Sequence, residues 1–299
     1  MFHSLARFKQ LPDYLQVWPG HGAGSACGKA LGAVPSSTVG YEKLFNWALQ
    51  HDEEDAFVAA LLDGQPEPPR YFAMMKQLNK LGPKVLHGVT HVQHRPIQDL
   101  TRLLNSGARV VDTRAPEAFA AAHMPGTINI PYSNSFVNWS GWLISYDQPF
   151  YLIVERHLVE QMARDLSQIG LDDLAGYFEP PTLGGWMEAG LSMQSYQMAT
   201  PRQIAQRIMA DDVYVLDVRN QSEWDEDRLT AGHHIMLGYL EEQAADLPRD
   251  KPVVVHCRTG MRSAIAASLL QARGVPGVIN MVGGIRDWMA DGLPVEHNT

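Results

Sequence analysis

The sequence predicts an α/β protein in which a mainly parallel sheet, covered by helices on both faces, occurs in two tandem copies. Short apolar strands alternate with helical segments, an order typical of parallel sheets. The pattern also repeats: Ala108–Arg114 and Val213–Arg219 are each an apolar strand that ends in Asp-x-Arg, and Trp186 and Trp288 each follow a Gly-Gly pair. The two tryptophans lie 102 positions apart, which fits two copies of one small domain.

The second copy shows the alternation most clearly. Its expected elements are, in order, a helix over Pro201–Met209, a strand over Val213–Asp217, a strand ending at Cys257, a helix running to about Arg273, and a strand over Val278–Met281. Ser263 is well suited to cap the second helix, and Gly274 suits its end. Because sites in such sheets form at the carboxyl ends of strands, Cys257 lies where a functional site is expected.

Residues before about 85 fall outside the repeat. They predict a strand over Leu15–Trp18 and helices over Tyr41–Gln50, Asp52–Leu62 and Tyr71–Leu81, and Gly82-Pro83 marks a boundary. The chain therefore divides into an N-terminal segment (1–84), a first α/β copy (85–196) and a second α/β copy (197–299).

Composition excludes several classes of protein. The 299 residues are 45% hydrophobic and 19% charged, which fits about two globular domains. A formal net charge of -9 argues against nucleic-acid binding, and no apolar stretch is long enough for a membrane span. The N-terminus lacks the apolar core of a signal peptide. Two cysteines cannot form a disulfide framework, so we expect a protein of the reducing cytoplasm.

The segment 253–263 carries most of the chemistry. A β-branched strand ends on Cys257, and a short loop with one glycine and two arginines leads into a helix. Loop amides, the positive end of the helix dipole and the guanidinium groups all favour a thiolate at this position. A buried core cysteine is the plainer alternative, but it needs no Arg-x-Gly-x-Arg after it.

We expect Cys257 to be the nucleophile. The expected active loop is Arg258, Thr259, Gly260, Met261 and Arg262. Arg258 and Arg262 are candidates for docking an anionic donor, whereas Arg262 can alternatively brace the loop against a carboxylate such as Asp217. Asp217 and Arg219 are expected to support the loop. His256 precedes the cysteine on the strand, so its side chain should point away from the site.

The Cys-Arg-x-Gly-x-Arg loop between a strand and a helix resembles the active loop of rhodanese-type sulfurtransferases. The Asp-x-Arg strands, the Gly-Gly-x-x-x-Trp segment and the ending Gly292-Leu293-Pro294 resemble the same family. The resemblance implies two tandem rhodanese-like domains. It also implies a sulfurtransferase that moves sulfane sulfur from thiosulfate or a persulfide, through a Cys257 persulfide and without a cofactor, to a thiol or cyanide-like acceptor.

The first copy departs from the family pattern. Carrying the spacing of the two tryptophans back from Cys257 leads to Glu155, in a segment without cysteine or glycine. A glutamate cannot hold a persulfide and repels an anionic donor, so this copy is expected to be catalytically silent. The turn His123–Pro131 is common in the family, and His123 is expected to be structural.

Trp18–Ser25, followed by Cys27-Gly28-Lys29, resembles the last part of a metallo-β-lactamase-fold domain. The order of parts resembles persulfide dioxygenase–rhodanese fusions, which place that domain before one silent and one active rhodanese module. The family's metal motif, His-x-His-x-Asp-His, is absent, and His91 and His94 have the wrong spacing. His21 alone cannot hold a metal, which needs about three protein ligands. We therefore expect a C-terminal remnant of that domain without a complete iron or zinc site, and a structural role for Cys27.

Three alternative functions stay open. Cysteine phosphatases use a similar loop, but with five residues between Cys and Arg, whereas here Ser263 occupies the position of that arginine. A non-enzymatic sulfur carrier or docking module for a persulfide dioxygenase is the second alternative, and a metallohydrolase or dioxygenase fragment without a complete metal site is the third. Apolar edges left by a partial first segment would favour a homo-oligomer or a partner chain.

Overall fold

The computed structural model describes residues 1–20, 35–63, 68–85, 88 and 91–297. Its contacts divide the chain into two units, Met1–Glu67 and Pro68–Thr299. His21, considered above as a metal ligand, and Cys27, expected to be structural, lie outside the described residues. None of the helices in the described part of the chain has the length and apolarity that a bilayer crossing requires.

The N-terminal unit joins short helices to a two-stranded antiparallel ribbon. Its elements are α1 (Phe2–Lys9), β1 (Gln16–Val17), β2 (Ser37–Thr38), α2 (Val39–Phe45), the 3-10 helix η1 (Trp47–Leu49) and α3 (Glu54–Leu62). The expected helix over Tyr41–Gln50 is interrupted at Asn46, because the Asn46 side chain accepts a hydrogen bond from Ala48 N–H and starts η1. Large apolar side chains are exposed on this unit, among them Tyr14, Trp18, Leu44 and Phe45.

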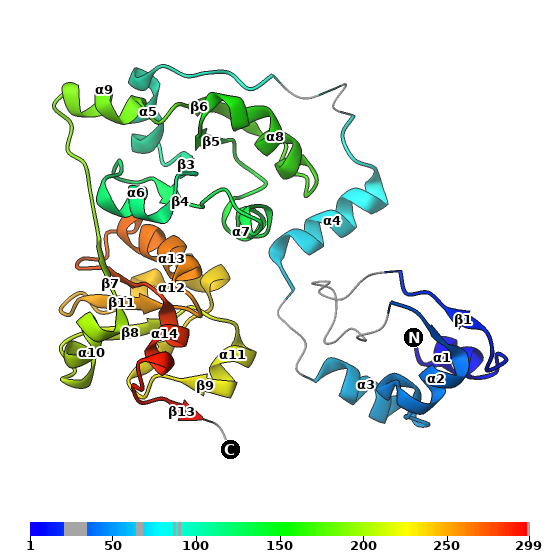
Figure 1. The fold of residues 1–299 in the computed structure, drawn as a ribbon. Helices are drawn as coiled ribbons and strands as arrows, with labels where there is room; N and C mark the ends of the chain where they lie inside the picture. The colour runs from blue at the N-terminus through cyan, green and yellow to red at the C-terminus, as the bar shows by residue number, and fades with distance from the viewer. Residues whose placement is uncertain (21–34, 64–67, 86–87, 89–90, 298–299) are drawn as a thin grey trace. The chain divides into compact units, whose positions relative to one another are not determined.

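The first module, residues 91–196, is built on a four-stranded parallel sheet in the order β4-β3-β5-β6 (Figure 1). Its strands are β3 (Arg109–Asp112), β4 (Ile128–Asn129), β5 (Phe150–Ile153) and β6 (Leu174–Phe178). Its helices are α5 (Ile97–Asn105), α6 (Pro116–Ala121), α7 (Phe136–Leu143), η2 (Arg156–Leu158), α8 (Val159–Ser167) and α9 (Thr182–Glu188).

Helix α4 (Arg70–Leu81) precedes the first module and packs on α7. The ring of Tyr71 lies so close to Gly141 of α7 that a side chain at Gly141 would meet it. Arg70 pairs with Glu242 of the second module at 2.7 Å. Although α4 belongs to the expected N-terminal segment 1–84, it therefore packs within the C-terminal unit.

The second module, residues 197–297, has a five-stranded parallel sheet in the order β10-β8-β11-β12-β7. Its strands are β7 (Gln197–Ala199), β8 (Tyr214–Asp217), β10 (Gly232–His234), β11 (Val253–His256) and β12 (Ile279–Met281), with a separate ribbon of β9 (Asp227–Arg228) and β13 (Glu296–His297). Its helices are α10 (Pro201–Met209), α11 (Gln221–Glu226), η3 (Leu237–Tyr239), α12 (Leu240–Gln243), η4 (Ala244–Asp246), α13 (Met261–Ala272) and α14 (Gly284–Ala290). The prediction of an α/β fold with mainly parallel sheets is confirmed.

Side chains alternate between two cores on either side of the second sheet. Val253, Val255 and Cys257 belong to one apolar cluster, and Val254 belongs to the other. This is the period-two alternation of a strand buried on both faces. His256, as the next residue after Val255, faces the second cluster.

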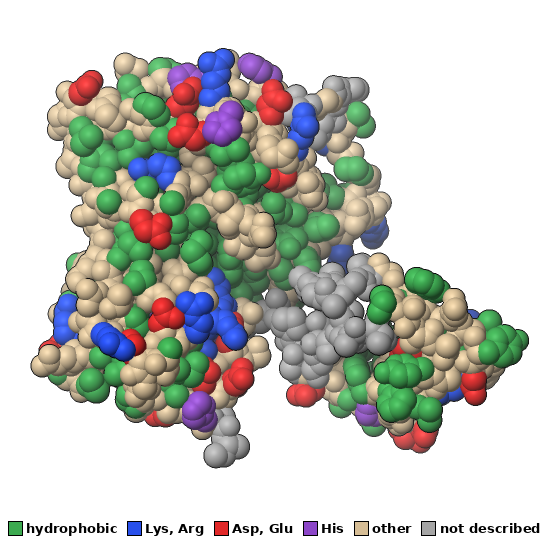
Figure 2. All heavy atoms as spheres, in the orientation of Figure 1, with side chains coloured by type: hydrophobic (Ala, Val, Ile, Leu, Met, Phe, Trp, Pro, Cys, Tyr) green, Lys and Arg blue, Asp and Glu red, His purple; other side chains and the backbone are tan. Residues whose placement is uncertain are grey.

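Helix α13 lies between the two modules and is buried on all sides. Every residue from Ser263 to Leu270 is buried. One side of the helix packs on β11 and β12, and another packs on β4 and α6 of the first module. A single apolar cluster continues through both modules, and Figure 2 shows hydrophobic side chains along their junction. A polar contact also joins α13 to β4 of the first module, since the backbone N–H of Asn129 donates to Ser268 Oγ at 2.8 Å.

Candidate active site

Cys257 lies at the carboxyl end of β11 with 1% of its surface exposed. The N–H of Gly260 donates to its Sγ at 3.2 Å. Gly260 has a φ of +97°, which glycine adopts without steric cost, and α13 begins at the next residue. A loop amide and the positive N-terminal end of the 12-residue helix α13 are thereby directed at one sulfur.

Ser263 has a different role from the expected helix cap. The helix starts two residues earlier, at Met261, so Ser263 lies in its first turn. Its hydroxyl donates to Asn280 Oδ1 of β12 at 2.6 Å and lies 3.6 Å from Cys257 Sγ. The prediction that Ser263 caps the helix is therefore wrong, because Gly260, in the left-handed conformation, is the N-cap residue of α13.

The carbonyl groups of the loop dock on the first turn of α14. Ile285 N–H donates to Cys257 O at 2.9 Å, and Arg286 N–H donates to Arg258 O at 3.2 Å. Gly284 has a φ of +59°, and a Cβ there would meet Cys257 O and lie 2.8 Å from Arg258 O. The Gly-Gly pair seen in the sequence thus permits the close approach of two backbones at the reactive cysteine.

Arg262 is held by a carboxylate, but that carboxylate is not Asp217. Its Nη1 and Nη2 donate to the two carboxylate oxygens of Glu223 on α11, at 2.6 and 2.8 Å. Burial opposes the charge of both groups, but the paired hydrogen bonds hold the pKa of Glu223 below its usual value and raise that of Arg262. Asp217 as the partner of Arg262 is therefore wrong, because Asp217 already binds Arg219.

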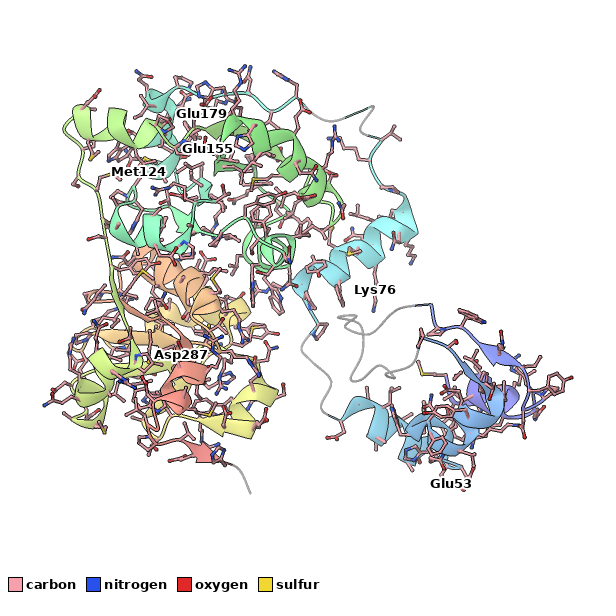
Figure 3. All side chains as sticks on the ribbon, in the orientation of Figure 1. Glu53, Lys76, Met124, Glu155, Glu179 and Asp287 are labelled. Atoms are coloured by element: carbon pink, nitrogen blue, oxygen red, sulfur yellow. The ribbon has the colours of Figure 1, made fainter. Side chains whose placement is uncertain are left out.

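The other loop side chains lie at the surface. Arg258, Thr259 and Met261 are exposed. In the described part of the chain no carboxylate pairs with the Arg258 guanidinium, whereas Arg286 binds Asp287 at 2.9 Å. Figure 2 shows basic side chains with acidic ones among them on the visible face of the second module, and Figure 3 labels Asp287 on α14.

Asp217 and Arg219 form a buried support behind the loop. Arg219 Nε donates to the two oxygens of Asp217 at 3.0 and 2.8 Å, and Nη1 donates to Asp227 at 2.7 Å. His256 Nε2 lies 3.6 Å from Asp217 Oδ2, beyond hydrogen-bond distance. Neither ring nitrogen of His256 has a hydrogen-bond partner among the described residues, and burial lowers the pKa of His256.

The first module has the same frame without a nucleophile. Asp112 pairs in register with Ile153, as Asp217 pairs with His256, so the residue equivalent to Cys257 is Val154. The expected equivalent, Glu155, is wrong by one position. It was placed with the spacing of 102 residues between the two tryptophans, whereas Val154 and Cys257 lie 103 residues apart. Val154 is buried and cannot carry sulfur, whereas Glu155 is exposed on this module (Figure 3).

His123 is buried in the first module. Its Nδ1 lies 2.8 Å from Phe119 O, and its ring stacks on that of Phe119. These contacts account for the histidine in packing terms.

The described residues do not fit the metal of the metallo-β-lactamase fold. No three His, Cys, Asp or Glu side chains among them come together as a metal site requires. His94 lies 4.0 Å from Glu179, and no third side chain of these types completes a site with them among the residues that the structure describes.

Glu223 and Asn280 are the site residues that the sequence patterns left without a role. Glu223 and Trp224 follow the second Asp-x-Arg strand, as Glu117 and Phe119 follow the first. This repeated acidic-aromatic pair was a signal for Glu223 in the sequence. Asn280 carried no such signal, since only the folded sheet brings β12 beside the loop.

Comparison with known proteins agrees with this geometry. The model of the rhodanese-like domain matches residues 200–291. A sulfurtransferase of Allochromatium vinosum is 30% identical over 93 residues, which cover 31% of this chain and 87% of that protein. The thiosulfate sulfurtransferase GlpE of Coxiella burnetii is 30% identical over 79 residues, which cover 26% of this chain and 74% of that protein.

A crystal structure of a metallo-beta-lactamase from Staphylococcus aureus is 45% identical, with a TM-score of 0.51, and covers 60% of this chain. The match spans 49% of that protein, about half of its length. Since the match to the Allochromatium vinosum sulfurtransferase covers most of that protein, the chain belongs to the rhodanese-like family, and over 60% of its length it is also similar to the metallo-beta-lactamase structure.

Proposed function

We propose that the protein transfers sulfane sulfur from thiosulfate or a persulfide to a thiophilic acceptor through a persulfide on Cys257. The observation that carries this proposal is the Gly260 N–H bond to Cys257 Sγ at the start of α13. The Gly260 N–H and the positive end of α13 suit an anionic persulfide, because the added sulfur bears the negative charge.

The reaction is a double displacement. The Cys257 thiolate attacks the outer sulfur of the donor, an S–S bond forms, and the donor S–S bond breaks. Its electron pair leaves with sulfite when the donor is thiosulfate, or with a thiolate when the donor is a persulfide. An acceptor thiolate or cyanide then attacks the outer sulfur of the Cys257 persulfide and regenerates the thiolate. No oxidant or reductant is consumed, since sulfur moves at constant oxidation state.

Several finer assignments belong to the same proposal. Arg258 is the first contact for an anionic donor, supported by its exposure beside Cys257. The reaction needs no bound metal or organic cofactor, because the thiolate supplies the nucleophile. A location in the reducing cytoplasm keeps that thiolate available.

Intact-mass measurement tests the proposal. Reduced wild-type protein is mixed with thiosulfate or a small persulfide, and then with cyanide. We expect a gain of one sulfur atom that cyanide removes, no gain in Cys257→Ser, and a normal gain in the matched control Cys27→Ser. No adduct with either donor would refute the proposal. A stable adduct that no acceptor removes would favour the sulfur-carrier alternative.

A further inference from the structure

Besides the buried Arg219, three arginines lie in or beside the loop of Cys257, and two of these three are paired with carboxylates. Arg262 is paired with Glu223 through two charge-assisted hydrogen bonds, and each side chain is only 18% exposed. Arg286 pairs with Asp287 at the surface. Arg258 has no carboxylate partner among the described residues, so one guanidinium remains for an incoming donor.

Arg262 lies in the chain between Gly260 and Ser263, and the Gly260 N–H and the Ser263 hydroxyl lie 3.2 and 3.6 Å from Cys257 Sγ. A guanidinium charge carried on this first turn of α13 acts on the charge of the reacting sulfur. If Arg262 were released from Glu223, it would place a second full positive charge beside the reacting sulfur. Glu223 cancels that charge, because the pair is nearly neutral seen from outside.

The two donor classes place different demands on this charge. Attack of a thiolate on thiosulfate brings three negative charges together, whereas attack on an alkyl persulfide anion brings two. Electrostatic repulsion grows with the product of the charges, so the dianion depends more strongly on a second cation.

We propose that Glu223 is a specificity-determining residue that pairs with Arg262 and thereby sets the active loop for singly charged sulfur donors over doubly charged ones. The inference rests on the proposed sulfur transfer. It differs from a purely structural role for the pair, because a brace alone would affect both donors equally.

The test compares the two donors in matched variants. Initial rates with thiosulfate and with 2-hydroxyethyl persulfide give kcat/KM for wild type, Glu223→Gln and the control Glu226→Gln. Glu226 is exposed on the same helix. A glutamine amide in place of the Glu223 carboxylate keeps the size of the side chain and one hydrogen-bond acceptor while removing its charge. We expect the ratio of thiosulfate to persulfide kcat/KM to rise about tenfold in Glu223→Gln and to stay at the wild-type value in Glu226→Gln.

A second variant assigns the gain to Arg262. In the double variant Glu223→Gln with Arg262→Gln, the ratio should return towards wild type, because both charges are gone. An unchanged ratio in a folded Glu223→Gln protein overturns the inference. If wild type forms the Cys257 adduct while the ratio does not move, only this inference fails. If wild type forms no adduct, the proposed function itself fails.

A measurement on wild type alone covers the case in which Glu223→Gln does not fold. Sulfate and methanesulfonate are unreactive anions with two charges and one charge, and each can protect Cys257 from alkylation. We expect methanesulfonate to protect at concentrations no higher than sulfate. Protection by sulfate at about tenfold lower concentration would overturn the inference.

Discussion

Gly284 is the residue at which the active loop leaves no room for a side chain. Its φ of +59° is unfavourable for other residues, and an added Cβ would meet the carbonyl oxygen of Cys257. We predict that Gly284→Ala lowers the free energy of unfolding by about 2–4 kcal/mol and greatly slows formation of the Cys257 persulfide. Urea denaturation and intact mass measure the two effects.

Gly274 provides a matched control for that substitution. Its φ of +73° is similar, but nothing lies within 4 Å of an added Cβ. Gly274→Ala should therefore cost about 1 kcal/mol from backbone conformation and leave persulfide formation unchanged. Equal losses in both variants would show that backbone strain alone, without the contact to the loop, explains the effect.

His256 makes the stability of the second module depend on pH. Burial lowers its pKa in the folded protein, while the unfolded chain titrates near the ordinary value of about 6.5. Below that pH the unfolded state binds a proton that the folded state does not, so the free energy of unfolding falls as the pH decreases from about 6.5. We predict a shallower slope between pH 6.5 and 5 in His256→Leu, measured by urea denaturation.

The exposed His157 supplies the comparison for this slope. His157→Gln should keep the wild-type slope, because this substitution leaves the buried His256 ring in place. If His256→Leu leaves the slope unchanged, the buried ring is not the source of the pH dependence.

At the level of single residues, local patterns predicted Cys257 and its loop because their chemistry is contiguous in the sequence. The partner of Arg262 could not be predicted in the same way. Glu223 lies 39 residues earlier in the chain, and several carboxylates were possible partners. Only the folded side chains show that Asp217 is paired with Arg219. Only the sheet register shows that Val154, and not Glu155, is the counterpart of Cys257.

Helix α13 connects the chemistry of the cysteine to the first module. Its first turn faces Cys257, and its middle is buried on every side. A helix apolar all round requires cover from two directions, which here comes from its own sheet and from β4 and α6. The sequence predicted this helix from its place after the loop and from Gly274 at its end, but the second packing partner comes from residues more than a hundred positions away.

Ser268 tests the contact between α13 and the first module. Its hydroxyl donates to Ile265 O and accepts the N–H of Asn129 at 2.8 Å. Ser268→Ala leaves that buried N–H without a partner, so we predict a loss of about 1–3 kcal/mol in the free energy of unfolding. Urea denaturation followed by tryptophan fluorescence measures it.

Ser167 on α8 is the matched control for Ser268. Its hydroxyl also donates to a carbonyl three residues earlier, Arg164 O, but at an exposed helix end. Ser167→Ala should change the free energy of unfolding by less than about 0.5 kcal/mol. A loss in Ser268→Ala that is no larger would mean that the contact with Asn129 contributes nothing measurable.

At the scale of the molecule, the module without a cysteine is part of the fold that presents the reactive one. The apolar cluster runs through both modules, and Glu241 of the second module binds Arg109 of the first at 2.6 Å as well as Arg273 just after α13. The repeat in the sequence predicted two similar units in a row. It did not predict that they share a core, because that depends on which helix faces are left uncovered after each sheet has formed.

A shared core means that the second module should not fold normally by itself. Removing residues 1–196 uncovers the side of α13 that packs on β4 and α6, and the cluster loses its half from the first module. We predict that the fragment 197–299 aggregates or unfolds at much lower urea concentration than the fragment 68–299, which keeps both modules and α4. The longer fragment should form the Cys257 persulfide at the rate of the full chain, since it retains every described contact of the loop. Light scattering, urea denaturation and intact mass on the two fragments decide the matter. A monomeric fragment 197–299 with the stability and rate of the longer one would show that the first module does not support the active helix.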